Sequence, residues 1–209
     1  ELLNQGYAVR AIQGDITSLN DCQNLIDQTI KIFGRLDILI NNGSLTMNGS
    51  FDNMQPEVFL DIYNSNSVGA VYPTKLALPH LKKTKGSVVF ISSLAGLHSM
   101  PSASAYGMGK MALTAFWQSL RIELSSTGIH FGICYVSFTQ VEGQKRMLTA
   151  DGSLIPVPKR PNLIVQSREK VSRSIVQMIR YRRTKTVLSL FGKMTSIAFR
   201  YFPRIVMRI

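Results

Sequence analysis

The sequence predicts an α/β fold, in which helices cover a doubly wound and mostly parallel sheet. Short apolar segments of strand length alternate with longer amphipathic segments, a pattern typical of parallel strands joined by helical crossovers. Polar or turn-forming residues follow four of the apolar segments. They are Asp15, Asn41-Asn42-Gly43, Ser92-Ser93 and Val136-Ser137. Ligands of such sheets bind beyond the carboxyl ends of the strands, so these positions predict the ligand side.

The N-terminal part of the chain predicts two strands and one complete helix. Residues 1–7 resemble the last turn of a helix, and residues 8–12 predict a short strand. A helix is expected over 18–33, because Ser18 is a good N-cap and apolar side chains then recur at helical spacing. Residues 36–40 are almost all apolar, which predicts a strand covered on both faces of the sheet.

The central part predicts two long helices around a buried strand. The first helix, over 56–83, contains Pro73 and Pro79, so a bend or a break is expected at these prolines. The buried strand is predicted at 87–91, where the residues are mostly apolar. The second helix is expected over 104–126.

The C-terminal part predicts two more strands, at 129–136 and 186–190, with a helix between them at 167–181. That helix carries its apolar side chains on one face. Residues 138–165 contain three prolines and predict a long irregular segment. The tail over 193–209 mixes apolar and basic residues.

Composition limits the class of protein. The chain has 209 residues, of which 45% are hydrophobic and 17% charged, so one domain with a substantial core is expected over 1–209. The net charge of +12 gathers toward a basic and apolar tail at 180–209, without the signature of a nucleic-acid-binding module, so no nucleic-acid partner is expected. Cys22 and Cys134 predict reduced structural thiols, and no apolar run has the length of a membrane span.

A serine, a tyrosine and a lysine form the candidate catalytic group. Tyr106 and Lys110 are four residues apart near the start of a predicted helix, so they share one helix face. Ser93 lies at the end of the preceding strand, thirteen positions before Tyr106. A phenol, an ammonium and a hydroxyl that converge there can move a proton to or from a carbinol or carbonyl oxygen.

These residues resemble the short-chain dehydrogenase/reductase family, whose fold is Rossmann-like. The resemblance covers nearly the whole chain, and its segments occur in the family's order. They are Gly14-Asp15-Ile16, Asn41-Asn42-Gly43, Asn66-Ser67-Val68-Gly69, Ser92-Ser93-Leu94-Ala95-Gly96, Tyr106 and Lys110. The segment 143–165 and the ending 201–206 look most like the branch that acts on lipophilic alcohols and ketones, including steroids and retinoids.

The resemblance implies an NAD(P)-dependent oxidoreductase that transfers a hydride between nicotinamide and a secondary alcohol or ketone. Tyr106 is then the general acid/base, and Lys110 stabilises its phenolate and binds the nicotinamide ribose. Ser93 holds the substrate oxygen, and Asn66 holds a water that links Lys110 to solvent. Tyr106 and Lys110 both contact the cofactor in this scheme.

The resemblance also implies which residues bind the adenosine and the carboxamide of the cofactor. Asp15 accepts a hydrogen bond from adenine beside the backbone of Ile16, and Asn42 and Gly43 approach the adenosine ribose. Thr139 is the candidate for the nicotinamide carboxamide. The cofactor is NADP or NAD, and the analogy with the lipophilic-substrate branch favours NADP.

Three departures from the family pattern affect the cofactor site. The glycine-rich phosphate turn is absent, so we expect a domain that is N-terminally incomplete and lacks its first βαβ part. The family's Asn-Asn-Ala-Gly stands here as Asn41-Asn42-Gly43-Ser44, and its Pro-Gly as Val136-Ser137. The family's carboxamide-binding threonine falls on Val141, which is why Thr139 is considered in its place.

Several alternatives stay open. Asp15 has a structural alternative as a cap of the helix over 18–33, and Asn41-Asn42-Gly43 as a simple turn. The whole chain has an alternative as a non-catalytic binding or scaffold member of the family with an impaired cofactor site. The tail either closes the substrate pocket, which we favour, or lies on an anionic membrane.

The resemblance finally implies a setting for the protein. Family members act on small-molecule alcohols and ketones as homodimers or homotetramers, here in lipid metabolism. The expected location is the cytoplasm, or a membrane surface, which would be the endoplasmic reticulum in a eukaryote.

Overall fold

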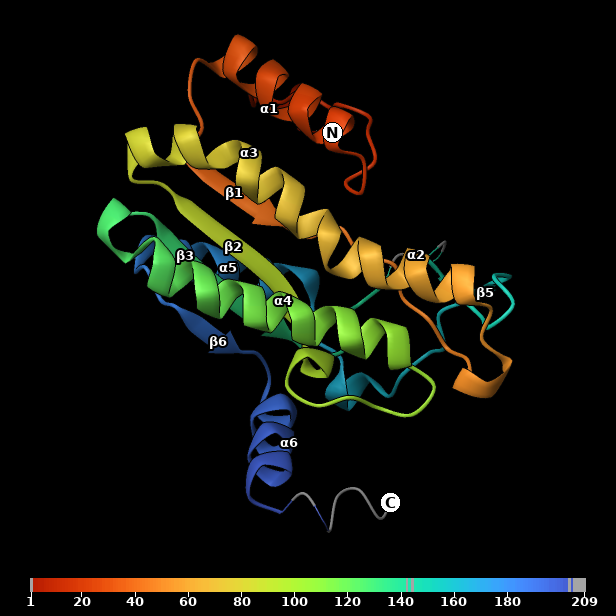
Figure 1. The fold of residues 1–209 in the computed structure, drawn as a ribbon. Coiled ribbons are helices and arrows are strands. Elements are labelled where there is room, and N and C mark those ends of the chain that lie inside the picture. The colour runs from red at the N-terminus through yellow and green to blue at the C-terminus, as the bar shows by residue number, and fades with distance from the viewer. Residues whose placement is uncertain (1, 142, 144, 203, 205–209) are drawn as a thin grey trace.

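The computed structural model describes residues 2–141, 143, 145–202 and 204. Its centre is a parallel sheet of four strands in the order β1-β2-β3-β6. These strands are β1 (Ile38–Asn41), β2 (Ser87–Ser93), β3 (His130–Val136) and β6 (Lys185–Val187). The predicted parallel α/β architecture is confirmed, and the carboxyl ends of the strands meet at one edge of the sheet (Figure 1).

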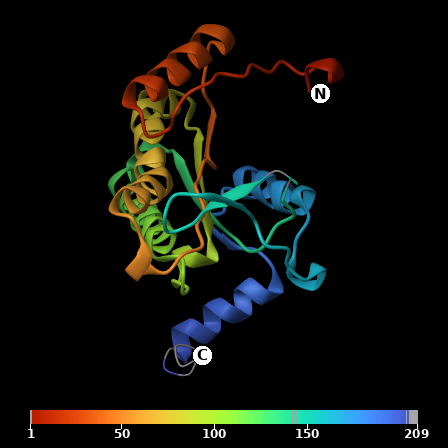
Figure 2. The same ribbon diagram turned by 90° about the vertical axis from the view of Figure 1, so that its right-hand side faces the viewer.

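Helices cover both faces of this sheet (Figure 2). The α-helices that the structure describes are α1 (Leu19–Phe33), α2 (Pro56–Asn66), α3 (Val68–Thr84), α4 (Ser104–Glu123), α5 (Arg168–Arg180) and α6 (Leu190–Tyr201). The helices α3 and α4 pack on one face, α1 lies against α3, and α5 covers β2 and β3 from the other face. The larger core lies under α3 and α4. Trp117 is part of it and donates its indole N–H to the Phe131 carbonyl at 3.1 Å.

The predicted ends of several helices are confirmed. Ser18 is the N-cap of α1 and accepts a hydrogen bond from the Asp21 amide, and Gly34 ends the helix at a φ of 75°. Ser167 caps α5 in the same way through the Lys170 amide. At the start of the chain, the expected final helical turn is a short 3₁₀ turn over Leu3–Gln5.

The strand predicted at 8–12 is wrong. These residues form no strand and are mostly exposed, because a β-strand needs a hydrogen-bonded neighbour and none of the described strands pairs with them. The two-sided burial predicted for 36–40 is also wrong. Leu39 packs against the larger core, but Ile38 and Ile40 on the opposite face of this edge strand are each 44% exposed.

The long helix predicted over 56–83 is two helices, and the break lies at Ser67 rather than at a proline. Pro73 and Pro79 stand inside α3. At the break, the Ser67 hydroxyl donates to the Tyr63 carbonyl at 2.7 Å, a local side-chain bond that competes with regular helix geometry. The break leaves Asn66 as the last residue of α2.

The segment over 138–165 is less irregular than predicted, because it contains a hairpin of β4 (Arg146–Leu148) and β5 (Leu154–Pro156). The Asp151 carboxylate accepts from the Ser153 amide at 3.0 Å, and Gly152 has a φ of 83°, so these residues form the turn. The hairpin packs on the loop after β1, where the Gln55 amide donates to the Ala150 carbonyl at 2.9 Å.

Both cysteines are buried and free, as predicted, and burial raises the pKa of the Cys134 thiol to about 12. The last expected strand is shorter than predicted, and most of the described tail is the helix α6. The tail residues 203 and 205–209 lie outside the described residues. Among the helices that the structure describes, none is long and apolar enough to cross a membrane.

Candidate active site

Four side chains of the predicted catalytic group converge near the carboxyl ends of the strands. They come from α2, β2 and α4 and are Asn66, Ser93, Tyr106 and Lys110. Ser93 is the last residue of β2, and its hydroxyl accepts a hydrogen bond from the Ala95 amide at 3.3 Å, which holds the following turn. Tyr106 lies in the first turn of α4, close enough to Ser93 for a hydrogen bond between their side chains. The Tyr106 phenol therefore meets the hydroxyl of Ser93, one of the two serines predicted at the end of this strand.

Lys110 lies one turn after Tyr106 on α4 and is 4% exposed. Its ammonium donates to the Ile91 carbonyl of β2 at 3.1 Å and lies 5.8 Å from the centre of the Tyr106 ring. An ammonium has three N–H groups, and among the described residues this carbonyl is its one hydrogen-bond partner. Lys110 therefore keeps donors for a further ligand beside the tyrosine.

Asn66 is 2% exposed at the end of α2. Its amide group donates to the carbonyls of Leu45 and Ile62, each at 2.8 Å, so the side chain is fixed. Its carbonyl oxygen Oδ1 is buried and has no partner among the described residues, which is costly unless a water or ligand occupies the space.

Close packing of α2 on α4 brings Asn66 to the lysine. A Cβ atom at Gly109 would lie 2.7 Å from the Cβ of Asn66, closer than side chains approach, so only glycine allows this contact. Because Gly109 immediately precedes Lys110, this contact places the asparagine beside the candidate catalytic group.

Burial dominates the protonation of the site. Desolvation raises the pKa of Tyr106, and the hydrogen bond with Ser93 opposes that rise. Desolvation, together with the smaller effect of the positive charge of Lys145, lowers the pKa of Lys110 to about 8. Lys145 belongs to the segment before β4, and no sequence pattern indicated that it comes near the site.

The predicted adenosine-binding residues also lie together, at the end of β1. The Ile16 side chain fills the space beside Gly43 and Gly69, where an added Cβ atom would lie 2.5 and 2.6 Å from it. A larger residue at position 43 would have to displace the Cδ1 methyl of Ile16. Asn42 follows the last residue of β1 and is exposed.

Asp15 does not cap the helix, because Ser18 occupies that position. One oxygen of the Asp15 carboxylate accepts from the Thr17 amide and hydroxyl, each at 2.8 Å, and these bonds lower its pKa. Asp15 therefore orders the turn before α1, next to Ile16.

Thr139 is not brought to the catalytic group by any described contact. Its hydroxyl donates to the Ser137 carbonyl at 3.2 Å, and its backbone forms a bridge with Gln166. Val141, two positions on, is 46% exposed.

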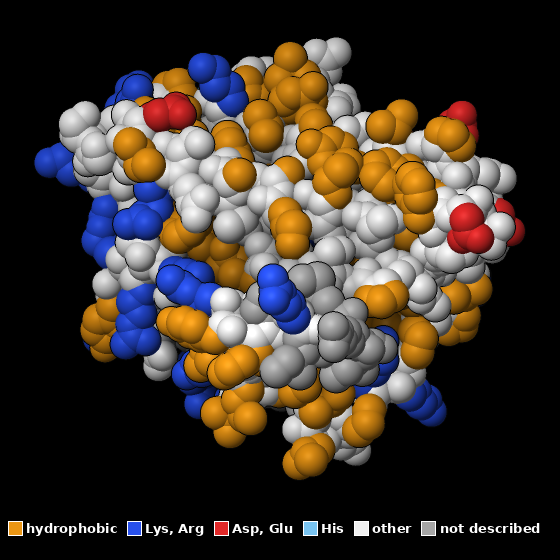
Figure 3. All heavy atoms as spheres, turned by 60° about the horizontal axis from the view of Figure 1, so that its bottom comes forward, with side chains coloured by type: hydrophobic (Ala, Val, Ile, Leu, Met, Phe, Trp, Pro, Cys, Tyr) orange, Lys and Arg blue, Asp and Glu red, His pale blue; other side chains and the backbone are white. Residues whose placement is uncertain are grey.

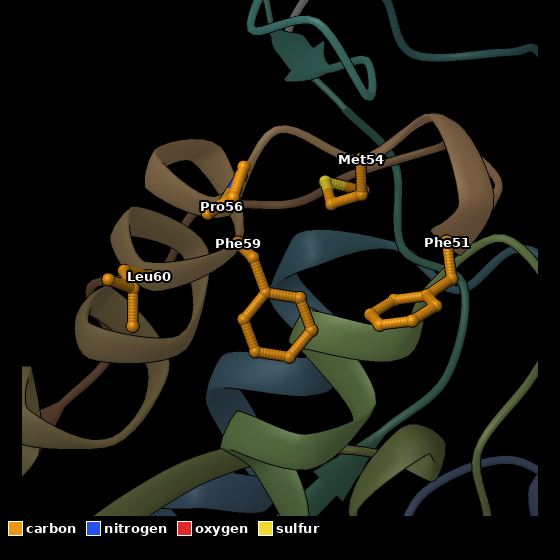
Figure 4. A pocket seen from close by; sticks show the side chains of 5 residues that line it. All are labelled: Phe51, Met54, Pro56, Phe59 and Leu60. Carbon is orange, nitrogen blue, oxygen red and sulfur yellow. The ribbon is translucent and has the colours of Figure 1, made fainter.

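An apolar hollow of about 340 Å³ lies at the start of α2 and the short turn before it (Figure 4). Its lining residues are Phe51, Met54, Pro56, Phe59 and Leu60. Met54 and Phe59 also belong to the apolar cluster against which Tyr106 packs. The tyrosine therefore has apolar walls on the side of α2.

A doubly wound parallel sheet with a serine, a tyrosine and a lysine grouped at its carboxyl edge has the architecture of a dehydrogenase domain. The chain belongs to the short chain dehydrogenase family, whose model matches residues 1–151. The sequence prediction of this family is confirmed.

Comparison with individual proteins agrees with this family. The chain is 41% identical over 117 residues to an 11-beta-hydroxysteroid dehydrogenase-like protein 4A from Arabidopsis thaliana, a match that covers 56% of this chain and 39% of that protein. The chain spans about two fifths of the length of the curated relatives it matches.

Two solved structures share the fold. A short chain dehydrogenase/reductase from Burkholderia phymatum in complex with NAD has a TM-score of 0.82 at 18% identity, covering 98% of this chain and 79% of that one. An alcohol dehydrogenase from Thermococcus sibiricus complexed with 5-hydroxy-NADP has a TM-score of 0.75 at 16% identity, covering 90% and 77%. At these identities the likeness concerns the fold alone.

Proposed function

We propose that the protein is an NAD(P)-dependent oxidoreductase that interconverts a secondary alcohol and a ketone. The observation that carries this proposal is the convergence of Ser93, Tyr106 and Lys110 around one point, with Asn66 behind them. In this function the bound nicotinamide supplies or accepts the hydride. The side chains of the protein hold the substrate oxygen and move its proton.

Ser93 donates a hydrogen bond to the substrate oxygen and holds it within reach of the Tyr106 hydroxyl. Because burial raises the pKa of Tyr106, the phenol is protonated at neutral pH, the form that donates a proton to a carbonyl oxygen. In the opposite direction Tyr106 must lose that proton, and the positive charge of Lys110 favours the phenolate.

The residues fit the nicotinamide-ribose end of the cofactor. Lys110 retains N–H groups for the ribose hydroxyls, and the unpartnered Oδ1 of Asn66 accepts from a water that continues the proton path to solvent. We assign Asp15, Ile16, Asn42 and Gly43 to the adenosine end and Thr139 to the carboxamide, although no described contact joins Thr139 to the catalytic group. These assignments extend the family likeness to this chain.

The proposed substrate is lipophilic, such as a steroid, a retinoid or another lipid, and the proposed cofactor is NADP. The apolar cluster against which Tyr106 packs supports an apolar substrate, as does the name of the Arabidopsis relative. The preference for NADP extends the likeness to the branch of the family that acts on lipophilic substrates.

Cofactor binding separates this function from that of a non-catalytic binding member. NADPH is expected to raise the unfolding temperature of the protein more than NADH, and NADPH with a lipophilic ketone is expected to give an alcohol. Differential scanning fluorimetry and loss of nicotinamide absorbance measure the two effects. If the protein reduced the ketone with neither NADPH nor NADH, a non-catalytic binding function would explain the structure better.

We also propose a homodimer or homotetramer. Exposed apolar side chains on the adjacent helices α2 and α4 support it, since Leu60 is 54% exposed and Met108 45% exposed. Light scattering after gel filtration is expected to give at least twice the mass of the chain, and Leu60→Glu with Met108→Glu is expected to reduce that mass. A monomer at micromolar concentration contradicts this proposal.

A further inference from the structure

The helix α6 leaves the sheet after β6 and packs on the turn that follows Ser93. Gly192 fits against Leu94, where an added Cβ atom would lie 3.0 Å from the leucine side chain. Phe199, two turns on, stacks on His98 with ring centres 3.7 Å apart and planes inclined by 6°. These contacts fix which face of α6 points inward.

The opposite face of α6 is apolar and exposed. We call Leu190, Met194, Ile197 and Tyr201 the outer stripe; their exposed fractions are 73%, 62%, 56% and 65%. Their spacing of four, three and four residues places all of them on one side of a helix. Single exposed apolar side chains are ordinary on a protein surface, but a continuous stripe of four favours an apolar partner.

Positive charge borders the outer stripe. Lys193 and Arg200 lie along one side of it, both exposed, and neither forms an ion pair within the described part of the chain. In the sequence, no Asp or Glu follows Glu169, whereas Lys and Arg recur to the end. Figure 3, which brings the lower side of Figure 1 forward, shows hydrophobic side chains interspersed with Lys and Arg on this face.

We propose that the outer stripe, with Lys193 and Arg200, binds the surface of a lipid bilayer that contains anionic lipids. A helix that lies in the interface buries its apolar side chains among the acyl chains and leaves basic side chains at the headgroups. Charge favours this partner over a second copy of the chain, because two such helices placed face to face would bring their basic residues together.

The same placement brings the catalytic group close to the membrane. Since the inner face of α6 contacts Leu94 and His98, directly after Ser93, a bilayer on the outer stripe lies one helix away from the site. A lipophilic molecule can then pass from the bilayer toward the apolar walls beside Tyr106. Binding itself rests on the surface of α6 and does not depend on the proposed reaction.

Flotation with vesicles tests this inference. The protein is mixed with vesicles of phosphatidylcholine alone, or with about one third phosphatidylserine, at low and high salt. Binding is expected only to the anionic vesicles, and weaker at high salt. Met194→Gln with Ile197→Gln is expected to weaken it at least about tenfold. Lys193→Glu with Arg200→Glu is expected to weaken it at least about 30-fold, from roughly fivefold for each lost basic charge.

Matched variants elsewhere on the surface separate local binding from the general charge of the protein. Ile122→Gln removes an apolar side chain that is 77% exposed at the far end of α4, and Lys31→Glu with Lys75→Glu makes the same change in net charge on α1 and α3. These controls are expected to bind vesicles within about twofold of the unchanged protein, since each lies away from α6.

Three outcomes would overturn the inference. They are no binding to anionic vesicles, equal loss of binding in the α6 variants and in the matched controls, and a lower oligomeric mass of the Met194→Gln/Ile197→Gln variant in the absence of lipid. The second outcome assigns binding to net charge alone, and the third assigns the outer stripe to a second copy.

Discussion

Replacement of Tyr106 by phenylalanine is expected to reduce turnover about 10³-fold, within the range found for loss of a general acid or base. The change removes only the hydroxyl that meets Ser93. The ring packs in a cluster with Met54 and Phe59 and stays in place, so the fold is expected to survive. Steady-state kinetics with NADPH and a lipophilic ketone measures the loss, and circular dichroism measures the fold.

The matched control is Tyr181→Phe, which removes a phenol hydroxyl at the end of α5, where the side chain is 59% exposed. Its turnover is expected to equal that of the unchanged protein. If Tyr106→Phe turned over as fast as this control, the proton would have to come from another group, and the role proposed for Tyr106 would be wrong.

Replacement of Lys110 by methionine is expected to abolish activity and yet to stabilise the fold. The ammonium is almost fully buried with one carbonyl as its partner, so desolvation costs free energy that a methionine of similar length does not. The lowering of its pKa from 10.5 to about 8 corresponds to about 3 kcal/mol as an upper bound on that cost. Chemical denaturation at pH 7 is expected to give Lys110→Met a free energy of unfolding about 1–3 kcal/mol higher than that of the unchanged protein.

The same burial predicts how stability changes with pH. In the folded state the pKa of Lys110 is about 8. Below that pH the lysine is charged in both the folded and the unfolded state, and the folded state bears the whole cost of desolvating the ammonium. As pH rises from about 8 toward 10.5, the folded state loses the proton before the unfolded state does, so the free energy of unfolding increases. The stabilities of the unchanged protein and of Lys110→Met therefore converge as pH rises from about 8 to 10.5.

Lys75→Met is the control, because Lys75 is exposed on α3 and bears no such cost. Its stability is expected to follow the unchanged protein at every pH. A Lys110→Met protein that is less stable than this control at pH 7 would show that the buried ammonium supports the fold, contrary to this account.

The sequence alone predicted the parts of the site that depend on local spacing. Tyr106 and Lys110 share a face because they are one turn apart in a helix, and Ser93 ends a strand whose apolar residues are unambiguous. The break after Asn66 was misplaced, because a proline is visible in sequence whereas the bond from Ser67 to the Tyr63 carbonyl is not.

Features that depend on distant neighbours could not be predicted in this way. Residues 8–12 have the composition of a strand, but pairing decides whether a strand forms. Ile38 and Ile40 suggested two-sided burial, whereas β1 lies at the sheet edge. The approach of Lys145 to Lys110 depends on a long connection whose path is set by its contacts with the loop after β1.

The most direct test of the central claim follows the hydride itself. NADPH that carries deuterium at the transferable position is incubated with the protein and a lipophilic ketone, and the product is examined by mass spectrometry. The account predicts an alcohol with deuterium on the carbinol carbon from the unchanged protein and from Tyr181→Phe, and about 10³-fold less of it in the same time from Tyr106→Phe. An unlabelled product, or equal labelling by all three proteins, would contradict it.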